Sequence, residues 1–222
     1  MKHQDWNNEL PRYLDHTVLR PEATKADVLR LCAEAKALGF VVIFVPPCYI
    51  DEAVAAVAGT GIRVGVPVGF PLGGHTTKTK VAEAVEAAAR GATVLDMVIN
   101  VSRLKSGDHD LVRGDMAEVV RATPRIEHKV ILEICLLTRE EKIAACRLAV
   151  ETSTGFSHAG ATVEDVRLMA EAVAGRAKVK ASGGIRDWKT TRALLEAGAD
   201  RIGTSASLKI MEEWRAARTD VR

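Results

Sequence analysis

Runs of almost continuous apolar residues alternate along the chain with segments in which apolar residues recur every three or four positions. Apolar runs of this kind indicate strands that are buried on both faces, as in a parallel sheet covered by helices. The runs that we interpret as strands are 13–19, 41–47, 62–71, 93–101, 130–137, 177–184 and 201–207. Because helical segments lie between them, the pattern predicts an α/β fold with a parallel sheet.

The segments between the strands have the period of an amphipathic helix. The apolar residues that share one face are Val28, Leu31, Cys32, Ala35 and Leu38 in 25–39, and Val163, Val166, Met169 and Val173 in 162–174. A threonine followed three residues later by an acidic residue marks the start of a helix. This signal occurs at Thr24 with Asp27, at Thr138 with Glu141 and at Thr162 with Asp165.

The strand count is one short of the eight that close a (β/α)8 barrel. Most helices here are followed by a glycine and an apolar strand, but the chain at 146–156 reads CRLAVETSTGF, with neither before the turn. About seven residues, the length of one strand and its cap, are therefore missing. We predict a single (β/α)8 TIM-barrel domain over residues 1–222, with the sixth strand missing or truncated before Thr152. We expect the segment 148–153 to leave its helix and fill the gap.

Composition excludes several classes of protein. The 222 residues contain 31 basic and 29 acidic side chains, so the net charge of +2 gives no reason to expect nucleic acid or a membrane surface as a partner. The polar N-terminus shows no signal peptide, and no apolar run is long enough to span a membrane. The four cysteines have no metal-binding spacing, and we expect them to be reduced and buried. These features predict a cytoplasmic protein.

Seven motifs of the chain resemble those of the deoxyribose-phosphate aldolase family. They occur in the family's order from about residue 12 to about residue 208 and read LDHTVLRPEAT, VGFPLGG, LDMVINVSRLKSGD, KVILE, TSTGFSHAGAT, VKASGGIRD and RIGTSAS. The resemblance implies a (β/α)8 barrel that cleaves 2-deoxyribose 5-phosphate to glyceraldehyde 3-phosphate and acetaldehyde. It also implies a lysine Schiff base as the electron acceptor, with no metal and no cofactor, and a phosphosugar as the small-molecule partner. A homodimer is plausible for such a barrel.

Two charged residues stand where catalytic groups are expected. Asp96 interrupts an apolar strand, where a buried charge is costly unless it is paired or functional, so the alternative is a structural ion pair. Lys180 follows an apolar strand at its C-terminal end, the active face of a barrel, and the alternative is an exposed loop lysine. The resemblance implies that Asp96 shuttles protons and that Lys180 lowers the pKa of the Schiff-base amine by like-charge repulsion. Lys178, deeper in the same strand, is expected to be structural or to lie at the bottom of the barrel.

Glycine-rich turns indicate where a phosphate could bind, since their backbone N–H groups can surround an anion. The turns in question are Thr154–Gly155, Gly183–Gly184 and Gly203–Ser205. Barrels commonly bind phosphate after their last two strands, and the resemblance implies that these loops hold the substrate phosphate. The resemblance also places Asp15 near the sugar hydroxyls. Its neighbour His16 alternates to the other face and is expected to pack in the core.

One position departs from the family. The resemblance places the Schiff-base lysine immediately before Thr-Ser-Thr-Gly, where this chain has Glu151, and a carboxylate cannot form an imine. A lesser departure is Ile134, where the family usually has threonine. Three hypotheses follow: a working deoxyribose-phosphate aldolase, a catalytically impaired relative that binds phosphosugars, or a different barrel enzyme such as an epimerase that uses Asp96 as its base.

Overall fold

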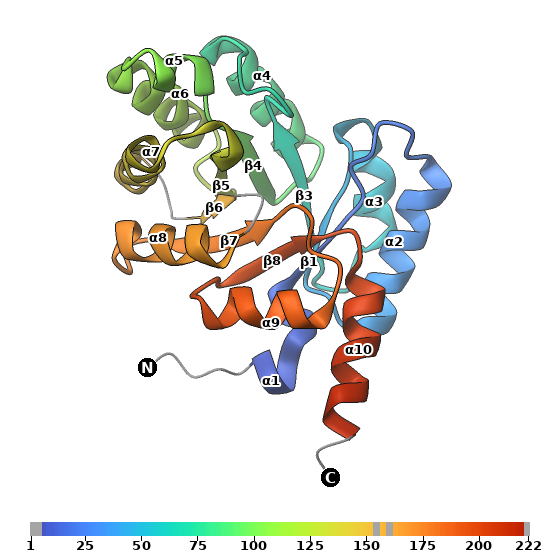
Figure 1. The fold of residues 1–222 in the computed structure, drawn as a ribbon. Coiled ribbons are helices and arrows are strands. Elements are labelled where there is room, and N and C mark those ends of the chain that lie inside the picture. The colour runs from blue at the N-terminus through green and yellow to red at the C-terminus, as the bar shows by residue number, and fades with distance from the viewer. Residues whose placement is uncertain (1–5, 153–155, 159–161, 220–222) are drawn as a thin grey trace.

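The computed structural model describes residues 6–152, 156–158 and 162–219, and the eight parallel strands in this part of the chain form a closed barrel (Figure 1). Each strand pairs with its neighbours in the sequence, and the last pairs with the first. The strands are β1 (Leu14–Thr17), β2 (Val42–Phe44), β3 (Arg63–Val68), β4 (Val94–Val98), β5 (Glu127–Ile131), β6 (Phe156–His158), β7 (Lys178–Ser182) and β8 (Arg201–Thr204). The predicted (β/α)8 fold is confirmed.

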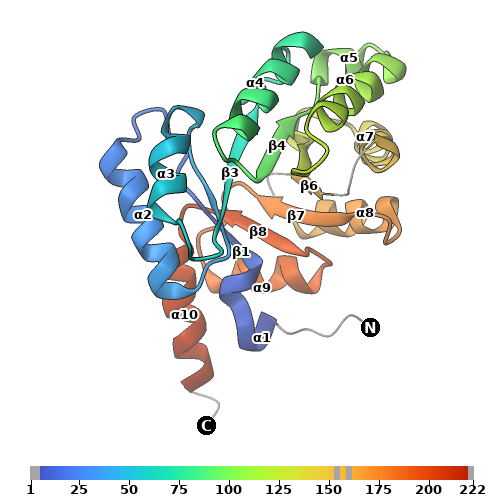
Figure 2. The same ribbon diagram turned by 180° about the vertical axis from the view of Figure 1, so that it is seen from behind.

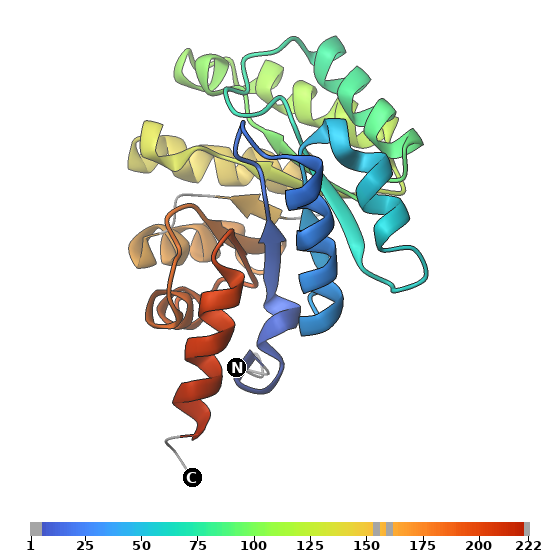
Figure 3. The ribbon, with the colours of Figure 1, turned by 90° about the vertical axis from the view of Figure 1, so that its right-hand side faces the viewer.

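Helices surround the barrel on its outer side, as two opposite views show (Figure 1, Figure 2). They are α1 (Trp6–Glu9), α2 (Lys25–Leu38), α3 (Ile50–Ala56), α4 (Thr77–Ala89), α5 (Val101–Lys105), α6 (His109–Ala122), α7 (Arg139–Thr152), α8 (Val163–Val173), α9 (Trp188–Glu196) and α10 (Ser207–Thr219). Three 3-10 helices lie between these elements: η1 (Leu10–Tyr13), η2 (Pro47–Tyr49) and η3 (Ile134–Leu136). Helix α1 and the C-terminal end of α10 lie at the same end of the barrel (Figure 3), where Arg218 donates a hydrogen bond to the Asn7 carbonyl at 2.6 Å.

The predicted helix starts are confirmed by their capping contacts. At α2 the Thr24 hydroxyl accepts from the Asp27 N–H, and the Asp27 carboxylate accepts from the Thr24 N–H at 3.0 Å. The same reciprocal pair joins Thr138 to Glu141 before α7. At α8 the Thr162 hydroxyl accepts a hydrogen bond from the Asp165 N–H. These contacts satisfy backbone N–H groups that have no partner within the helix, so each helix has a defined first turn.

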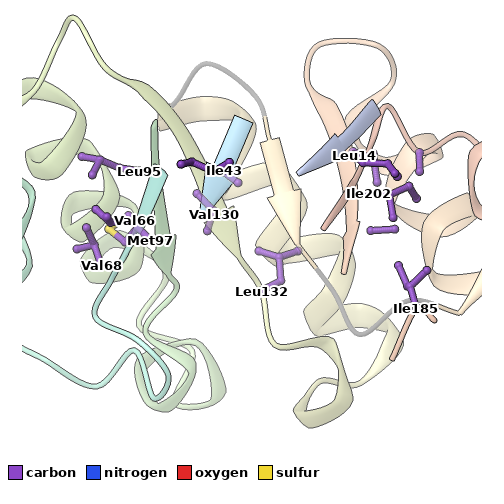
Figure 4. Close-up of a cluster of buried hydrophobic side chains, with 14 of the residues drawn as sticks. Leu14, Ile43, Val66, Val68, Leu95, Met97, Val130, Leu132, Ile185 and Ile202 are labelled. Carbon is purple, nitrogen blue, oxygen red and sulfur yellow. The ribbon is translucent and has the colours of Figure 1, made fainter. Parts of the chain in front are cut away.

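The main hydrophobic core lies between the strands and the helices. Because side chains alternate along a strand, one set points outward to the helices and the other points into the barrel. The outward set includes Leu14, Ile43, Val66, Leu95, Val130 and Ile202, which are buried in one cluster with apolar side chains of the helices (Figure 4). The inward set is different in character, because it includes Asp15, Phe44, Asp96, Lys129 and Lys180, all of them buried.

The expectation for the segment before Thr152 is wrong in one respect. No strand precedes Thr152 after β5 in the described residues, as predicted, but α7 runs on to Thr152, so 148–152 stays helical instead of filling the gap. Leu148 and Ala149 are buried in the core cluster, and leaving the helix would remove them from it. The gap is filled by β6, which follows the Thr-Ser-Thr-Gly turn. It pairs with β5 through Ser157 and His158, and with β7 through Phe156 and Ser157.

The predicted position of the fifth strand is also wrong. We expected 130–137, whereas β5 starts at Glu127 and ends at Ile131, and residues 134–136 form η3. The strand begins with polar residues because its inward side chains meet charges rather than apolar groups. Glu127 forms an ion pair with Arg63 of β3, and Lys129 lies near Asp96 of β4. Strand prediction from apolar runs does not recognise such charged residues as part of a strand.

The predictions from composition are right only in part. All four cysteines are free thiols, but Cys48 and Cys135 are exposed, whereas Cys32 and Cys146 are buried as expected. The two exposed thiols lie in the short 3-10 helices η2 and η3 outside the core. Burial raises the pKa of Cys146 to about 12. Within the residues that the structure describes, no helix is long and apolar enough to cross a membrane.

Candidate active site

A pocket of about 660 Å³ opens at the C-terminal ends of the strands, which is where barrel enzymes carry their active sites. Six residues that the sequence singled out line it: Asp96, Lys180, Gly183, Gly184, Gly203 and Ser205. Asp15 lies below the pocket and contacts one of them, Lys180. The two other candidates, Thr154 and Gly155, lie outside the described residues. The fold therefore brings together the predicted residues that it describes.

Lys180 occupies the centre of the site. Its Nζ atom lies 2.9 Å from Asp96 Oδ2 on β4 and 2.6 Å from Asp15 Oδ2 on β1. All three side chains are almost completely buried. The alternative of an exposed loop lysine is therefore excluded, and the pair of Asp96 with Lys180 that the sequence implied is present. The geometry alone is equally that of a buried ion pair and that of a catalytic centre.

Three further residues of the site were missed by the sequence analysis. Lys129 Nζ lies 3.3 Å from Asp96 Oδ1 and 3.4 Å from Asp15 Oδ2, and Arg201 Nε donates to Asp15 Oδ1 at 3.0 Å. The ring of Phe44 covers both amines, with its centroid 4.0 Å from Lys180 Nζ and 4.6 Å from Lys129 Nζ. The charges at 129 and 201 stand near strand starts, where a charge usually indicates solvent exposure.

The electrostatics of this cluster favour an ionised Asp15. Burial alone would raise the pKa of Asp15, but the neighbouring Lys129, Lys180 and Arg201 outweigh it and hold the pKa well below its usual range. Burial is the largest influence on Lys180 and lowers its pKa, although Asp15 and Asp96 act in the opposite direction. An amine with a lowered pKa is easier to deprotonate, which is the property that nucleophilic and proton-transferring lysines need.

The glycines of the site serve two different purposes. At Gly203 a side chain would collide with the site itself, because a Cβ atom there would lie 2.8 Å from Lys180 Cε and 2.9 Å from Ser182 Cβ. Gly183 and Gly184 follow β7 with φ values of 90° and 72°, a conformation that L-residues rarely adopt. They turn the chain at the pocket wall, where their backbone is open to a ligand. The sequence analysis treated all three as phosphate turns and missed the role of Gly203 in making room for Lys180.

The pocket wall carries three more charged residues that the sequence analysis did not name: Arg20, Glu133 and Arg186. Glu133 has a φ of 54°, which is uncommon for a residue with a side chain and is found preferentially at functional sites. The neighbouring Ile134, noted as a departure, is buried. Arg20 lies in the loop after β1, and Arg186 lies in the loop after β7.

Two secondary expectations can be checked directly. His16 points away from the barrel interior: its Nε2 atom lies 2.8 Å from Glu34 Oε2 on α2, and its ring packs against Phe40. Burial lowers the pKa of His16, more strongly than Glu34 raises it. The packing role is confirmed. Lys178 stands at the start of β7 and is exposed, at the opposite end of the strand from the pocket.

Comparison with known proteins agrees with the fold. No family model matches the chain. A curated deoxyribose-phosphate aldolase from Thermoanaerobacter sp. (strain X514) is 50% identical over 215 residues, which cover 92% of this chain and 96% of the relative. Since 92% of 222 residues is about 204, the alignment contains about 11 positions with no counterpart in this chain.

Solved structures of aldolases also resemble this chain in fold. A structure described as "QR15, an Aldolase" superposes with a TM-score of 0.91 at 36% identity, covering 97% of this chain and 100% of that one. The deoxyribose phosphate aldolase from Aeropyrum pernix, described as tetrameric, superposes with a TM-score of 0.85 at 28% identity, covering 92% and 90%.

The closed parallel barrel carries a buried lysine between two carboxylates, below a pocket at the strand ends. Together with the similarity to the proteins above, this barrel places the chain among the aldolases. The chain belongs to the deoxyribose-phosphate aldolase family, whose members are lyases.

Proposed function

We propose that the pocket binds 2-deoxyribose 5-phosphate and that its chemistry is reversible cleavage to glyceraldehyde 3-phosphate and acetaldehyde. The observation that carries this proposal is the position of Lys180, buried between Asp15 and Asp96 at the floor of the pocket. Retro-aldol cleavage leaves an electron pair next to the former carbonyl carbon, and a protonated imine accepts it. The same reaction needs a group that moves protons beside the imine.

In this proposal each residue of the centre has its own task. Asp96 transfers protons, because its carboxylate faces the pocket and is held by Lys180 and Lys129. The family resemblance gives the position of Lys180 to an auxiliary amine, whose charge lowers the pKa of the Schiff-base amine. In this chain Lys180 is itself the amine that the pocket offers to a carbonyl. Asp15 stays ionised and fixes Lys180, and its nearness to the sugar hydroxyls is an expectation from the family. Gly183, Gly184, Gly203 and Ser205 form the phosphate side of the pocket. The family resemblance adds Thr154 and Gly155, which lie outside the described residues.

We further propose that covalent catalysis in this chain is slow. Family resemblance puts the Schiff-base lysine directly before Thr152, and Glu151 in that position lies in α7 rather than at a strand end. The unmatched positions in the alignment with the Thermoanaerobacter enzyme support the loss of a segment. Without that lysine, the amine best placed in the pocket is Lys180. Burial lowers the pKa of Lys180, but the carboxylates at 2.6 and 2.9 Å favour its charged form and hold the amine in place, so its attack on a carbonyl is slow.

The second candidate function is phosphosugar binding without turnover. It is favoured by the pocket that Lys180, Gly184 and Ser205 line, combined with Glu151 at the position where the family resemblance puts the imine-forming lysine. Family membership leaves the epimerase hypothesis without support. A cytoplasmic location and a homodimer stay predictions.

One experiment tests both candidates. The protein is incubated with 2-deoxyribose 5-phosphate while glyceraldehyde 3-phosphate formation is followed by a coupled assay, and binding is measured by calorimetry. We expect clear binding with slow turnover, and borohydride treatment should trap little adduct, all of it on Lys180. Fast turnover would contradict the proposed impairment. A failure to bind the sugar phosphate would contradict the function itself.

A further inference from the structure

Arg20 lies three residues beyond β1 and lines the pocket. Strand β1 pairs with β8 in a register that sets Asp15 beside Gly203, so the chain leaving β1 runs next to the chain leaving β8 at Ser205. Strand β8 in turn pairs with β7, which leads into Gly183 and Gly184. Arg20 therefore stands on the side of the pocket that carries the proposed phosphate turns.

The guanidinium of Arg20 is held in place by two carboxylates. Its Nη2 atom lies 2.5 Å from Asp27 Oδ2, and its Nε atom lies 3.3 Å from Glu22 Oε1. Asp27 is itself fixed by the Thr24 N–H, which holds the pKa of that carboxyl far below its ordinary value. A guanidinium has five N–H donors, and Nη1 of Arg20 has no partner among the described residues. Its side chain is oriented but keeps donors available for an anion.

The charge of the pocket wall also favours an anion. The cationic lining residues are Lys180, Arg20 and Arg186, and the anionic ones are Asp96 and Glu133. Lys180 is already neutralised by the carboxylates of Asp15 and Asp96. Arg20 is also paired, but its partners Asp27 and Glu22 do not line the pocket, whereas Asp96 does. The positive charges that face a ligand without a lining carboxylate paired to them are therefore those of the two arginines. The Arg20 side chain is 44% exposed, so it can reach a ligand, but solvent weakens its attraction.

We infer that Arg20 binds the phosphate group of the ligand and gives the pocket its preference for phosphorylated over unphosphorylated sugars. This inference rests on the proposed function of the pocket. A planar guanidinium suits two oxygens of a phosphate, and a charge-assisted hydrogen bond is stronger than a neutral one. At a half-exposed position, losing such a charge-assisted hydrogen bond corresponds to a change in affinity of about tenfold.

The test compares Arg20→Gln with Arg30→Gln. Arg30 also forms an ion pair with Asp27, but it does not line the pocket, so it is a matched control for the loss of that pair. Inorganic phosphate, 2-deoxyribose 5-phosphate and 2-deoxyribose are titrated into each protein by calorimetry. Arg20→Gln should weaken both phosphate ligands by about tenfold and leave 2-deoxyribose unchanged, whereas Arg30→Gln should change none of the three. Arg20→Lys should give an intermediate affinity, because lysine keeps the positive charge but lacks the planar guanidinium that donates to two phosphate oxygens at once.

The outcomes separate this inference from the proposed function. If the unmodified protein binds 2-deoxyribose 5-phosphate and Arg20→Gln binds it equally well, Arg20 is not a phosphate ligand and the proposed function stands. If both arginine variants weaken binding equally, the effect passes through Asp27 and the inference is overturned. If the unmodified protein binds neither phosphate ligand, the proposed function is wrong and the inference falls with it.

Discussion

Replacing Asp15 by Asn removes a carboxylate on which three cations converge. Asp15 is fully buried, and Lys180, Arg201 and Lys129 lie 2.6, 3.0 and 3.4 Å from its oxygens. Asn has almost the same shape, so packing is preserved while the charge is lost. Lys180 and Lys129 then keep Asp96 as a buried partner and Lys129 also keeps the half-buried Glu127, whereas Arg201 keeps the Arg12 carbonyl. Leaving buried charge without its partner costs about 3–5 kcal/mol.

The magnitude of the loss is large enough to measure directly. For a chain of this length, roughly 2–4 °C of melting temperature is lost per kcal/mol, so Asp15→Asn should melt roughly 6–20 °C lower. Urea unfolding at neutral pH should give the same loss of free energy of unfolding. The control is Glu196→Gln, which removes the exposed partner of Arg192 on α9 and should cost less than about 0.5 kcal/mol.

The pH dependence gives a second, independent readout. The folded-state pKa of Asp15 is lower than its unfolded value of about 3.9, so the unfolded chain takes up the proton first as the pH falls. The stabilisation by Asp15 is therefore fully present above about pH 5 and is lost progressively below about pH 4. The difference between the two proteins should stay constant from about pH 5 to 8 and shrink in acid. A difference no larger than that of the Glu196 control, or one that does not depend on acid, would refute the assigned electrostatics.

The remaining predictions concern ligand and chemistry. Asp96→Asn should reduce any cleavage of 2-deoxyribose 5-phosphate by roughly 10²–10⁴-fold without changing the circular dichroism spectrum, and full turnover would show that Asp96 does not transfer the proton. Gly184→Asp should weaken phosphate binding in calorimetry by charge repulsion, whereas Gly184→Asn has a similar backbone cost and no charge; equal affinities would move the phosphate site elsewhere. Inserting Ala-Gly-Ala-Asp-Phe-Val-Lys between Glu151 and Thr152 should raise cleavage by several orders of magnitude and move the borohydride adduct from Lys180 to the new lysine. The same insertion ending in Met is its control, and equal rates for the two insertions would disprove the role of the missing amine.

Much of the fold could be predicted from the sequence, because most strand segments are predominantly apolar and the helices α2, α7 and α8 start with a capping signal. The failures have two physical causes. The interior of this barrel is charged, so β5 begins with Glu127 and Lys129, residues that a hydrophobic pattern assigns to a loop. β6 was missed because three residues with one large apolar side chain give no periodic signal.

The site was predictable to the extent that a charge interrupts an apolar run. Asp96 and Lys180 do so, and the structure brings them into contact. Lys129 and Arg201 do not, because they stand near strand starts and meet Asp15 only when the barrel closes. Arg20 lies in a loop, where an arginine is unremarkable until the pocket is known.

The short β6 has a consequence for how the barrel can open. It pairs in register with β5 at two positions, through Ser157 and His158, and with β7 at two positions, through Phe156 and Ser157. In contrast, β4 pairs with β5 at five positions. A closed barrel has no strand edges, but detaching these three residues would create two at once, along β5 and β7. The barrel is therefore closed between β5 and β7 by only a few backbone pairs. If β6 detached, the barrel would become an open sheet whose edges could pair with a second copy of the chain.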